Sequence, residues 1–257
     1  MALKVRRPRW FDGTALCIGS MAPDLGYAIS GRIGVDTHDW DGLVSVVLPL
    51  ALLFTFAARW IVADVAPAHM PDLGFARLRS WRVTARRQPA VLVTVSSCVI
   101  GIATHVLLDA FTHPGRFGAR ALGYDDVVVH VLGRSARLTD VFQLLGHTLG
   151  SLIGFLMLVD IGRRRLLEDW YGADAVRSAR AVEVSRTGTV VFWATVAAGT
   201  VIGMATGWGT GRLVEIVRTM VGCGVGAIVG SLLPICRPRR PQTKTPPDSC
   251  ALVTSAP

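Results

Sequence analysis

The strongest chemical signal in the sequence is the short stretch THVLLDAFTHPG at positions 104–115. Its ionisable residues His105, Asp109 and His113 are spaced four apart, which places them on one face of an α-helix within about 80°. Neutral imidazoles and a carboxylate one turn apart are suitable ligands for zinc, iron or manganese. Pro114 and Gly115 would end the helix directly afterwards. The stretch predicts a metal or catalytic site at a helix end. A polar cap facing headgroups and water, or a proton or ion path, is the alternative.

Two further segments place ionisable side chains beside apolar sequence. In GSMAPDLGY, residues 19–27, Asp24 follows Pro23, which removes a backbone donor and interrupts a helix. Asp24 would face a polar cavity as a metal ligand, or cap the helix that starts after Pro23. In THDWDGL, residues 37–43, Asp41 suits a helix N-cap and His38 is the better candidate for a site.

A fourth candidate is a polar stripe in a later apolar run, formed by Asp140, Gln143, His147 and Ser151. Spacings of three, four and four put these residues on one helix face. His147 is interpreted as a ligand, as a hydrogen-bonding group behind a ligand, or as a satisfied core histidine.

The composition indicates that these residues lie in a membrane protein. Of the 257 residues 51% are apolar and 18% are charged, whereas soluble domains carry about 25% charged residues. This composition excludes a disordered chain, a coiled coil and a disulfide scaffold. Five apolar runs approach the length of about 20 residues that a crossing helix needs. They are residues 43–63, 90–111, 141–161, 189–208 and 214–236.

A sixth apolar segment, residues 14–30, is shorter and contains Asp24, so it predicts a protected crossing or a re-entrant segment. The predicted fold class is therefore all-α, a polytopic membrane helix bundle of about five to six transmembrane helices. Residues 1–236 would form a single membrane-embedded domain. Residues 237–257, rich in Pro, Ser and Thr, are predicted to form a disordered tail.

The basic residues predict an orientation. The net charge is +9, and arginines gather in loops 64–89 and 162–188 and after Cys236. These segments share one side if the spans alternate, and the positive-inside rule favours the cytoplasm for that side. Asp24, His38, the stretch 104–115 and the start of the span with His147 then converge on the opposite face. Because no basic helix or zinc-finger spacing is present, we expect no nucleic-acid partner.

Glycines recur every fourth residue in three of the runs. The sets are Gly146, Gly150 and Gly154; Gly199, Gly203, Gly207 and Gly211; and Gly222, Gly226 and Gly230. Such a bare face lets two helix backbones approach closely in lipid. The three ladders predict a compact bundle, and they would also suit a homo-oligomer.

The string GSMAPDLGY, a His followed by an apolar span, THVLLDAFTHPG and a Gln-containing span together resemble a bacterial integral-membrane family, domain of unknown function 4184. The resemblance covers about residues 15–160, and the remaining spans agree in hydropathy alone. It implies a multi-pass protein of the bacterial cytoplasmic (inner) membrane and no particular activity. The family carries Ser-His-Pro near its N-terminus, whereas residues 7–12 here read RPRWFD. A site that uses that His would lack one member in this chain.

A looser similarity links the Pro-Asp and His-x-x-x-Asp motifs to membrane-bound metal-dependent hydrolases, which implies an Asp/His metal site. The resulting hypothesis is a metal-dependent hydrolase with zinc, iron or manganese held by Asp24, His105, Asp109 and His113. His38 or His147 would be a further ligand or the catalytic base, and a lipid headgroup ester or phosphoester would be the substrate. The alternatives are a transporter or ion-path protein and a non-catalytic scaffold in the bilayer.

Overall fold

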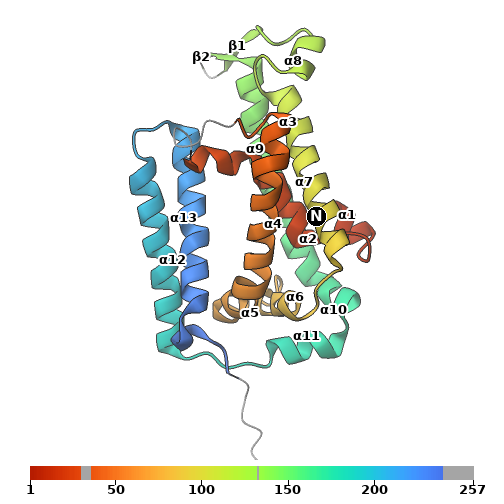
Figure 1. Ribbon diagram of the computed structural model, residues 1–257, viewed down its shortest axis with the longest axis vertical. Coiled ribbons are helices and arrows are strands. Elements are labelled where there is room, and N and C mark those ends of the chain that lie inside the picture. Colours follow the sequence, from red (N-terminus) through yellow and green to blue (C-terminus); the bar gives the residue numbers. More distant parts are fainter. Residues whose placement is uncertain (30–35, 132, 240–257) are drawn as a thin grey trace, which may run out of the picture.

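The computed structural model describes residues 1–29, 36–131 and 133–239. Within these residues, five helices are long and apolar enough to cross a membrane. They are Trp40–His69, α7 (Val91–Thr112), α9 (Leu138–Arg163), α12 (Arg186–Gly207) and α13 (Arg212–Leu232). Figure 1 shows α12 and α13 as a hairpin beside a group that contains α2, α4 and α7. The predicted all-α, polytopic membrane bundle is confirmed.

The helix Trp40–His69 is continuous but not uniform. It contains α3 (Trp40–Gly42), α4 (Leu48–Ala57) and α5 (Ala63–Val65), with π-helical turns at Leu43–Val47 and Ala58–Val62 and a 3-10 turn at Ala66–His69. Pro49 lies at the start of α4. A proline inside a helix lacks an N–H and crowds the carbonyl four residues earlier, and a widened turn gives the ring room beside that carbonyl. The π turn therefore precedes the proline.

Short elements cover the basic end of the bundle. They are α1 (Ala2–Arg6), a 3-10 turn at Leu78–Arg82, α6 (Val83–Arg86), α10 (Leu166–Tyr171), α11 (Ala173–Arg180) and a 3-10 turn at Pro234–Cys236. Arg82 joins two of the basic loops, because its Nη1 donates to the Ala179 carbonyl at 2.5 Å. His69 donates to the Cys236 carbonyl at 2.7 Å. The three basic segments therefore share one end, as alternation of the spans predicts.

The opposite end carries α8 (Phe117–Ala121) and an antiparallel hairpin of β1 (Val128–Val131) and β2 (Arg134–Arg137), in which Val128 pairs with Arg137. This hairpin stands at the end of the bundle away from α10 and α11 (Figure 1). The predicted tail lies outside the described residues from position 240 onward. Its start is paired, because the backbones of Arg239 and Glu183 exchange hydrogen bonds of 2.9 Å.

The segment predicted at 14–30 is broken rather than a continuous crossing helix. It consists of α2 (Gly13–Met21) and a 3-10 helix at Pro23–Ile29. Nine residues of α-helix rise about 14 Å, which is half of the bilayer core. The helix α2 packs closely along α7, where a Cβ at Gly101 would overlap the backbone of Leu16 and Ser20. The backbone break at Pro23 is thus covered by protein, as a membrane requires.

Two of the three glycine ladders pack against each other. A Cβ at Gly199 would overlap the Gly222 carbonyl, and one at Gly203 would overlap the Arg218 carbonyl. The α12–α13 hairpin therefore depends on its bare faces. By contrast, no described atom lies within 4 Å of a Cβ built at Gly146, Gly150 or Gly154 on α9. A homo-oligomer through α9 stays a prediction.

The packed glycines of α12 and the unpacked glycines of α9 allow a matched test of the predicted helix packing. We expect Gly203→Leu to lower the free energy of unfolding in detergent by about 1–3 kcal/mol, because the side chain forces two backbones apart. Gly150→Leu meets open space and gains helix propensity, so it should leave that free energy unchanged or raise it by up to about 1 kcal/mol. Denaturant unfolding followed by circular dichroism would measure both, and an equal loss in the two variants would contradict the packing.

Asp12 holds three segments together through a buried ion pair. It caps α2 by accepting from the Ala15 N–H at 3.2 Å, and its Oδ2 accepts from the Thr94 hydroxyl of α7 at 2.8 Å. Its backbone N–H donates to Ser97 at 2.9 Å, and its Oδ1 pairs with Arg59 of the helix Trp40–His69. The two charged side chains are only 1% and 4% exposed. No spacing pattern in the sequence indicates this pair.

Lys4 adds a further positive charge at the basic end of the bundle. Its ammonium lies 5.4 Å from the Trp170 ring centre and 5.5 Å from that of Tyr171, and it donates to the Pro8 carbonyl at 2.6 Å. Burial lowers the pKa of Lys4 below its usual value, and the nearby Asp12 carboxylate opposes that shift. These contacts dock the N-terminal helix onto α10.

The ion pair predicts a strong non-additive effect on stability. Arg59→Met leaves the Asp12 charge buried without its main partner and should cost about 3–5 kcal/mol of unfolding free energy. Combining it with Asp12→Asn, which keeps an acceptor for the helix cap, should recover part of that loss. Arg87→Met, at an exposed position, is the control. If the double variant loses the sum of the two single losses, the residues do not act as a pair.

Candidate metal site

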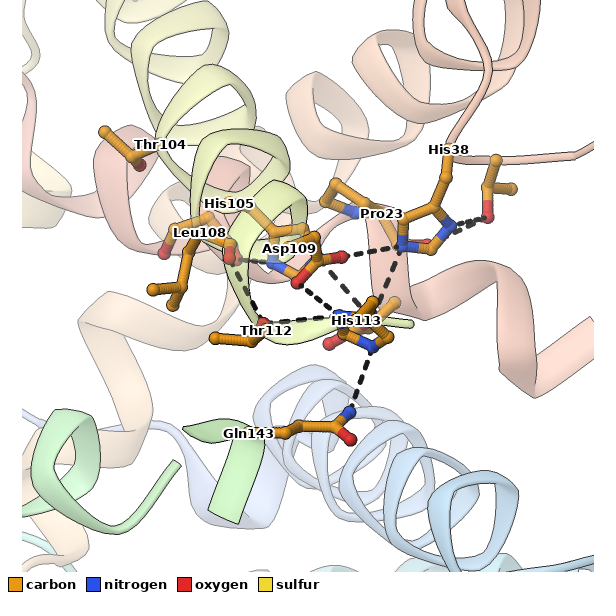
Figure 2. Close-up of polar contacts among 12 residues, drawn as sticks. Pro23, His38, Thr104, His105, Leu108, Asp109, Thr112, His113 and Gln143 are labelled. Carbon is orange, nitrogen blue, oxygen red and sulfur yellow. Dashed lines mark hydrogen bonds and ion pairs between the residues drawn. The ribbon is translucent and has the colours of Figure 1, made fainter. Parts of the chain in front are cut away.

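The candidate site lies where three chain segments meet at the end of α7. His105 and Asp109 occupy its last two turns, and His113 follows its last residue with extended backbone. His38 lies in the turn before the helix that begins at Trp40, and Asp24 lies in the first turn of the 3-10 helix Pro23–Ile29. Figure 2 shows His38, His105 and His113 arranged around Asp109. Helix ends and a backbone break thus bring the side chains together.

The imidazole and carboxylate atoms are spaced as ligands of one ion would be. The Nε2 atoms of His38 and His105 lie 3.4 Å and 3.2 Å from Oδ2 of Asp109. Oδ1 of Asp24 lies 3.8 Å and 3.6 Å from the same two nitrogens. Asp24, His38 and His105 each offer a ligand atom within 4.8 Å of the others. Ligand bonds of about 2.0–2.2 Å place neighbouring ligand atoms about 3–4 Å apart.

The hydrogen bonds of His105 fix which nitrogen faces the cluster. Its Nδ1 donates to the Ser20 carbonyl at 2.8 Å, so the lone pair lies on Nε2 in the neutral ring. The Nε2 atom is buried and faces Oδ2 of Asp109 at 3.2 Å and Oδ1 of Asp24 at 3.6 Å. A lone pair facing carboxylate oxygens is repelled unless a cation lies between them. The cluster therefore requires either a proton on Nε2 or a metal ion.

His38 is held in the same way. Its Nδ1 lies 3.4 Å from the Thr37 hydroxyl oxygen, which accepts because the hydroxyl proton is donated to the Pro23 carbonyl at 3.0 Å. Asp36 supports the turn by accepting from the His38 backbone N–H at 2.8 Å. Hydrogen bonds to the second ring nitrogen are the usual way to orient a metal-binding histidine. Both histidines thus direct Nε2 into the cluster.

His113 occupies a different position from the other two histidines. Its Nδ1 lies 3.4 Å from Oδ1 of Asp109, the oxygen that faces away from His38 and His105. Its Nε2 accepts from the Gln143 amide of α9 at 3.0 Å (Figure 2). The Nδ1–H is then shared between Asp109 and the Thr112 hydroxyl oxygen, which lies 3.3 Å from Nδ1. His113 is thus placed to orient the Asp109 carboxylate.

The remaining sequence candidates lie outside the cluster. His147 is exposed on α9 and does not belong to the group of possible ligands among the described residues. Asp41 is the second residue of its helix, so Asp39, not Asp41, holds the N-cap position. Gln143 belongs to the polar stripe read from the sequence, but its contact with His113 was not predicted. That contact joins residues 30 positions apart, which helical spacing cannot indicate.

The charge of the cluster suits a divalent cation. Two carboxylates and two neutral imidazoles carry two negative charges, and the four side chains are between 8% and 29% exposed. Partly buried charges of one sign require compensation. Oxygen and imidazole nitrogen ligands in this number are typical of zinc, iron and manganese sites.

A comparison with known protein families identifies the family of this chain. Residues 1–235 match the family described as Domain of unknown function (DUF4184). The chain belongs to this family. No curated protein and no solved structure matches it. The resemblance to DUF4184 is therefore confirmed, and the similarity to metal-dependent hydrolases stays a prediction.

The match includes residues 7–12, where this DUF4184 chain reads RPRWFD. Asp12 of this segment contacts Ser97 near the basic end of α7, whereas the candidate site begins at His105. The segment has no atom in the described cluster. Residues 7–12 therefore supply none of the four clustered side chains.

The geometry predicts that variants of the ligands and variants of the orienting residues lose metal affinity to different extents. For zinc titrated against a chelating indicator in detergent, we expect His105→Ala to abolish binding because Nε2 is lost. His113→Ala should weaken binding by about 10- to 100-fold, the usual effect of removing a group that orients a ligand. His147→Ala is the matched control and should bind as the unaltered protein does. A loss in His147→Ala equal to that in His105→Ala would contradict this assignment.

Proposed function

We propose that this DUF4184 protein is a metal-dependent hydrolase embedded in the bacterial cytoplasmic membrane, acting on an ester or phosphoester at the lipid headgroup. The observation that carries the proposal is the convergence of Nε2 of His38 and of His105 on carboxylate oxygens of Asp24 and Asp109, at 3.2–3.8 Å. Two partly buried carboxylates that converge on one point require a compensating positive charge. A divalent ion between these groups would supply that charge and use the lone pairs of both imidazoles.

The roles follow from the contacts. Asp24, His38 and His105 would hold zinc, iron or manganese, and Asp109 would complete the ligand set. The bound ion would act as a Lewis acid and lower the pKa of a coordinated water. His113 orients Asp109 through its second oxygen. Because His38 directs Nε2 at the cluster, it is assigned here as a ligand and not as a separate base.

The location favours a substrate at the membrane interface. The cluster lies at the end of α7 and at the start of the helix whose first residue, Trp40, is 78% exposed. Exposed Trp residues at helix ends are typical of the headgroup region. A headgroup ester or phosphoester lies at the same depth, whereas a substrate deep in the bilayer would not reach these ligands.

The decisive experiment combines metal loading with hydrolysis. Detergent-solubilised protein loaded with one metal at a time is mixed with phospholipid micelles, and released headgroups and fatty acids are measured. We expect turnover that a chelator removes and that Asp109→Ala, His113→Ala abolishes together with metal binding, while His147→Ala keeps both.

Other outcomes would favour the alternative functions. Metal binding without hydrolysis would overturn the hydrolase and leave a structural ion in a scaffold. Well-folded protein without metal, combined with proton flux in proteoliposomes that Asp109→Ala removes, would support an ion path.

A further inference from the structure

A second feature lies at the basic end of the molecule, far along the bundle from the metal site. A hollow of about 470 Å³ is lined by Arg59, Trp60, Asp64, Ala85 and Arg86. The first three residues belong to the helix Trp40–His69, and the last two belong to α6. This volume is in the range of small-molecule sites, which is about 300–1,000 Å³. The hollow opens to the surface of the bundle.

Two exposed tryptophans define its depth in a bilayer. Trp40 and Trp60 are 78% and 66% exposed on the same helix. At a rise of about 1.5 Å per residue they are about 30 Å apart, which is the thickness of the hydrocarbon core. Tryptophan favours both borders of that core. With Trp40 at one border, Trp60 and the hollow lie at the other, where lipid phosphates begin.

The charges around the hollow leave a surplus of positive charge. The carboxylate of Asp64 is already bound by Arg82 at 2.7 Å, and Nε of Arg86 lies 4.0 Å from the same oxygen. Arg59 is paired with Asp12, yet its Nε is a buried donor without a partner among the described residues. The lining thus has two guanidiniums and one carboxylate, and that carboxylate is neutralised by Arg82 from outside the hollow. Arg86 also donates to the Ser178 hydroxyl at 3.5 Å. Guanidinium groups bind phosphate oxygens in a planar, two-pronged geometry.

An apolar strip leads from the hollow toward the bilayer centre. Phe56 and Trp60 stack with ring centres 4.9 Å apart, and Leu53 is exposed one turn earlier. Spacings of three and four place these side chains on one face of the helix. A molecule with an anionic head at Arg86 would lay a hydrocarbon chain along this strip.

We propose that this hollow binds the phosphate of an anionic phospholipid from the surrounding bilayer, with one acyl chain against Leu53, Phe56 and Trp60. Arg86 contacts the phosphate, and Trp60 covers the junction of headgroup and chain. The site is independent of the metal cluster, so its presence or absence does not depend on hydrolase activity.

Native mass spectrometry of the detergent-solubilised protein tests the proposal. We expect one phosphatidylglycerol to remain bound at concentrations at which phosphatidylcholine does not. Arg86→Gln should weaken that binding about fivefold, the effect of one basic side chain at an anionic membrane surface. Arg87→Gln is the matched control, because it removes the same charge from the adjacent exposed residue and does not line the hollow. Its affinity should be unchanged.

A second variant separates the hollow from general electrostatics. Ala85→Trp fills the hollow without changing charge, and we expect it to lose the bound phosphatidylglycerol while its melting temperature stays near that of the unaltered protein. Equal weakening by Arg86→Gln and Arg87→Gln, equal affinity for the two lipids, or unchanged binding in Ala85→Trp would overturn the proposal. Displacement by millimolar inorganic phosphate would also overturn it, because the site would then recognise free phosphate.

Discussion

The buried carboxylate of Asp12 is the interaction on which the arrangement of the N-terminal half depends. A charge buried inside the protein must be paired or removed, and Asp12 is paired with Arg59 while it caps α2 and accepts from Thr94 of α7. These bonds fix the height at which α2 begins along α7. Because α2 has a set length, its end is fixed as well, and the Ser20 carbonyl reaches Nδ1 of His105. An ion pair at one end of α2 thereby sets the tautomer of a histidine at the other.

The metal cluster owes its form to interrupted helices. A continuous crossing helix satisfies its own backbone and can present side chains only at helical spacing. The break at Pro23 and the turn before Trp40 allow Asp24 and His38 to approach α7 from two other directions. The backbone carbonyls freed at these breaks are used, since Ser20 and Pro23 accept from His105 and Thr37. The same breaks that would be costly in lipid thus supply the orienting hydrogen bonds.

Local sequence patterns were sufficient to predict the membrane spans and most of the clustered residues. Hydropathy located all five spans, and the four-residue spacing of His105, Asp109 and His113 placed them on one face. Alternation of the spans predicted that Asp24 and His38 would join them. The pattern did not distinguish His113, which faces the outer oxygen of Asp109, from the histidines that face the inner one. That difference depends on Gln143 of another helix.

Two other features could not be predicted because they depend on which helices become neighbours. The ladders of α12 and α13 pack together because a short turn joins them, whereas the same spacing on α9 faces no described atom. Asp12 and Arg59 lie 47 positions apart in the sequence, one outside and one inside an apolar run. Periodicity within a single segment carries no information about such a pairing.

The order of these elements along the chain has a consequence for synthesis. Every clustered ligand precedes residue 110, so the set is complete before α12 and α13 leave the ribosome. The hairpin of α12 and α13 packs on its own glycine faces and contacts the earlier part of the chain at both of its ends. Arg218 bonds the Ala28 carbonyl near one border, and Cys236 accepts from His69 near the other. During synthesis the hairpin is therefore added to a chain that already contains every ligand residue of the metal cluster.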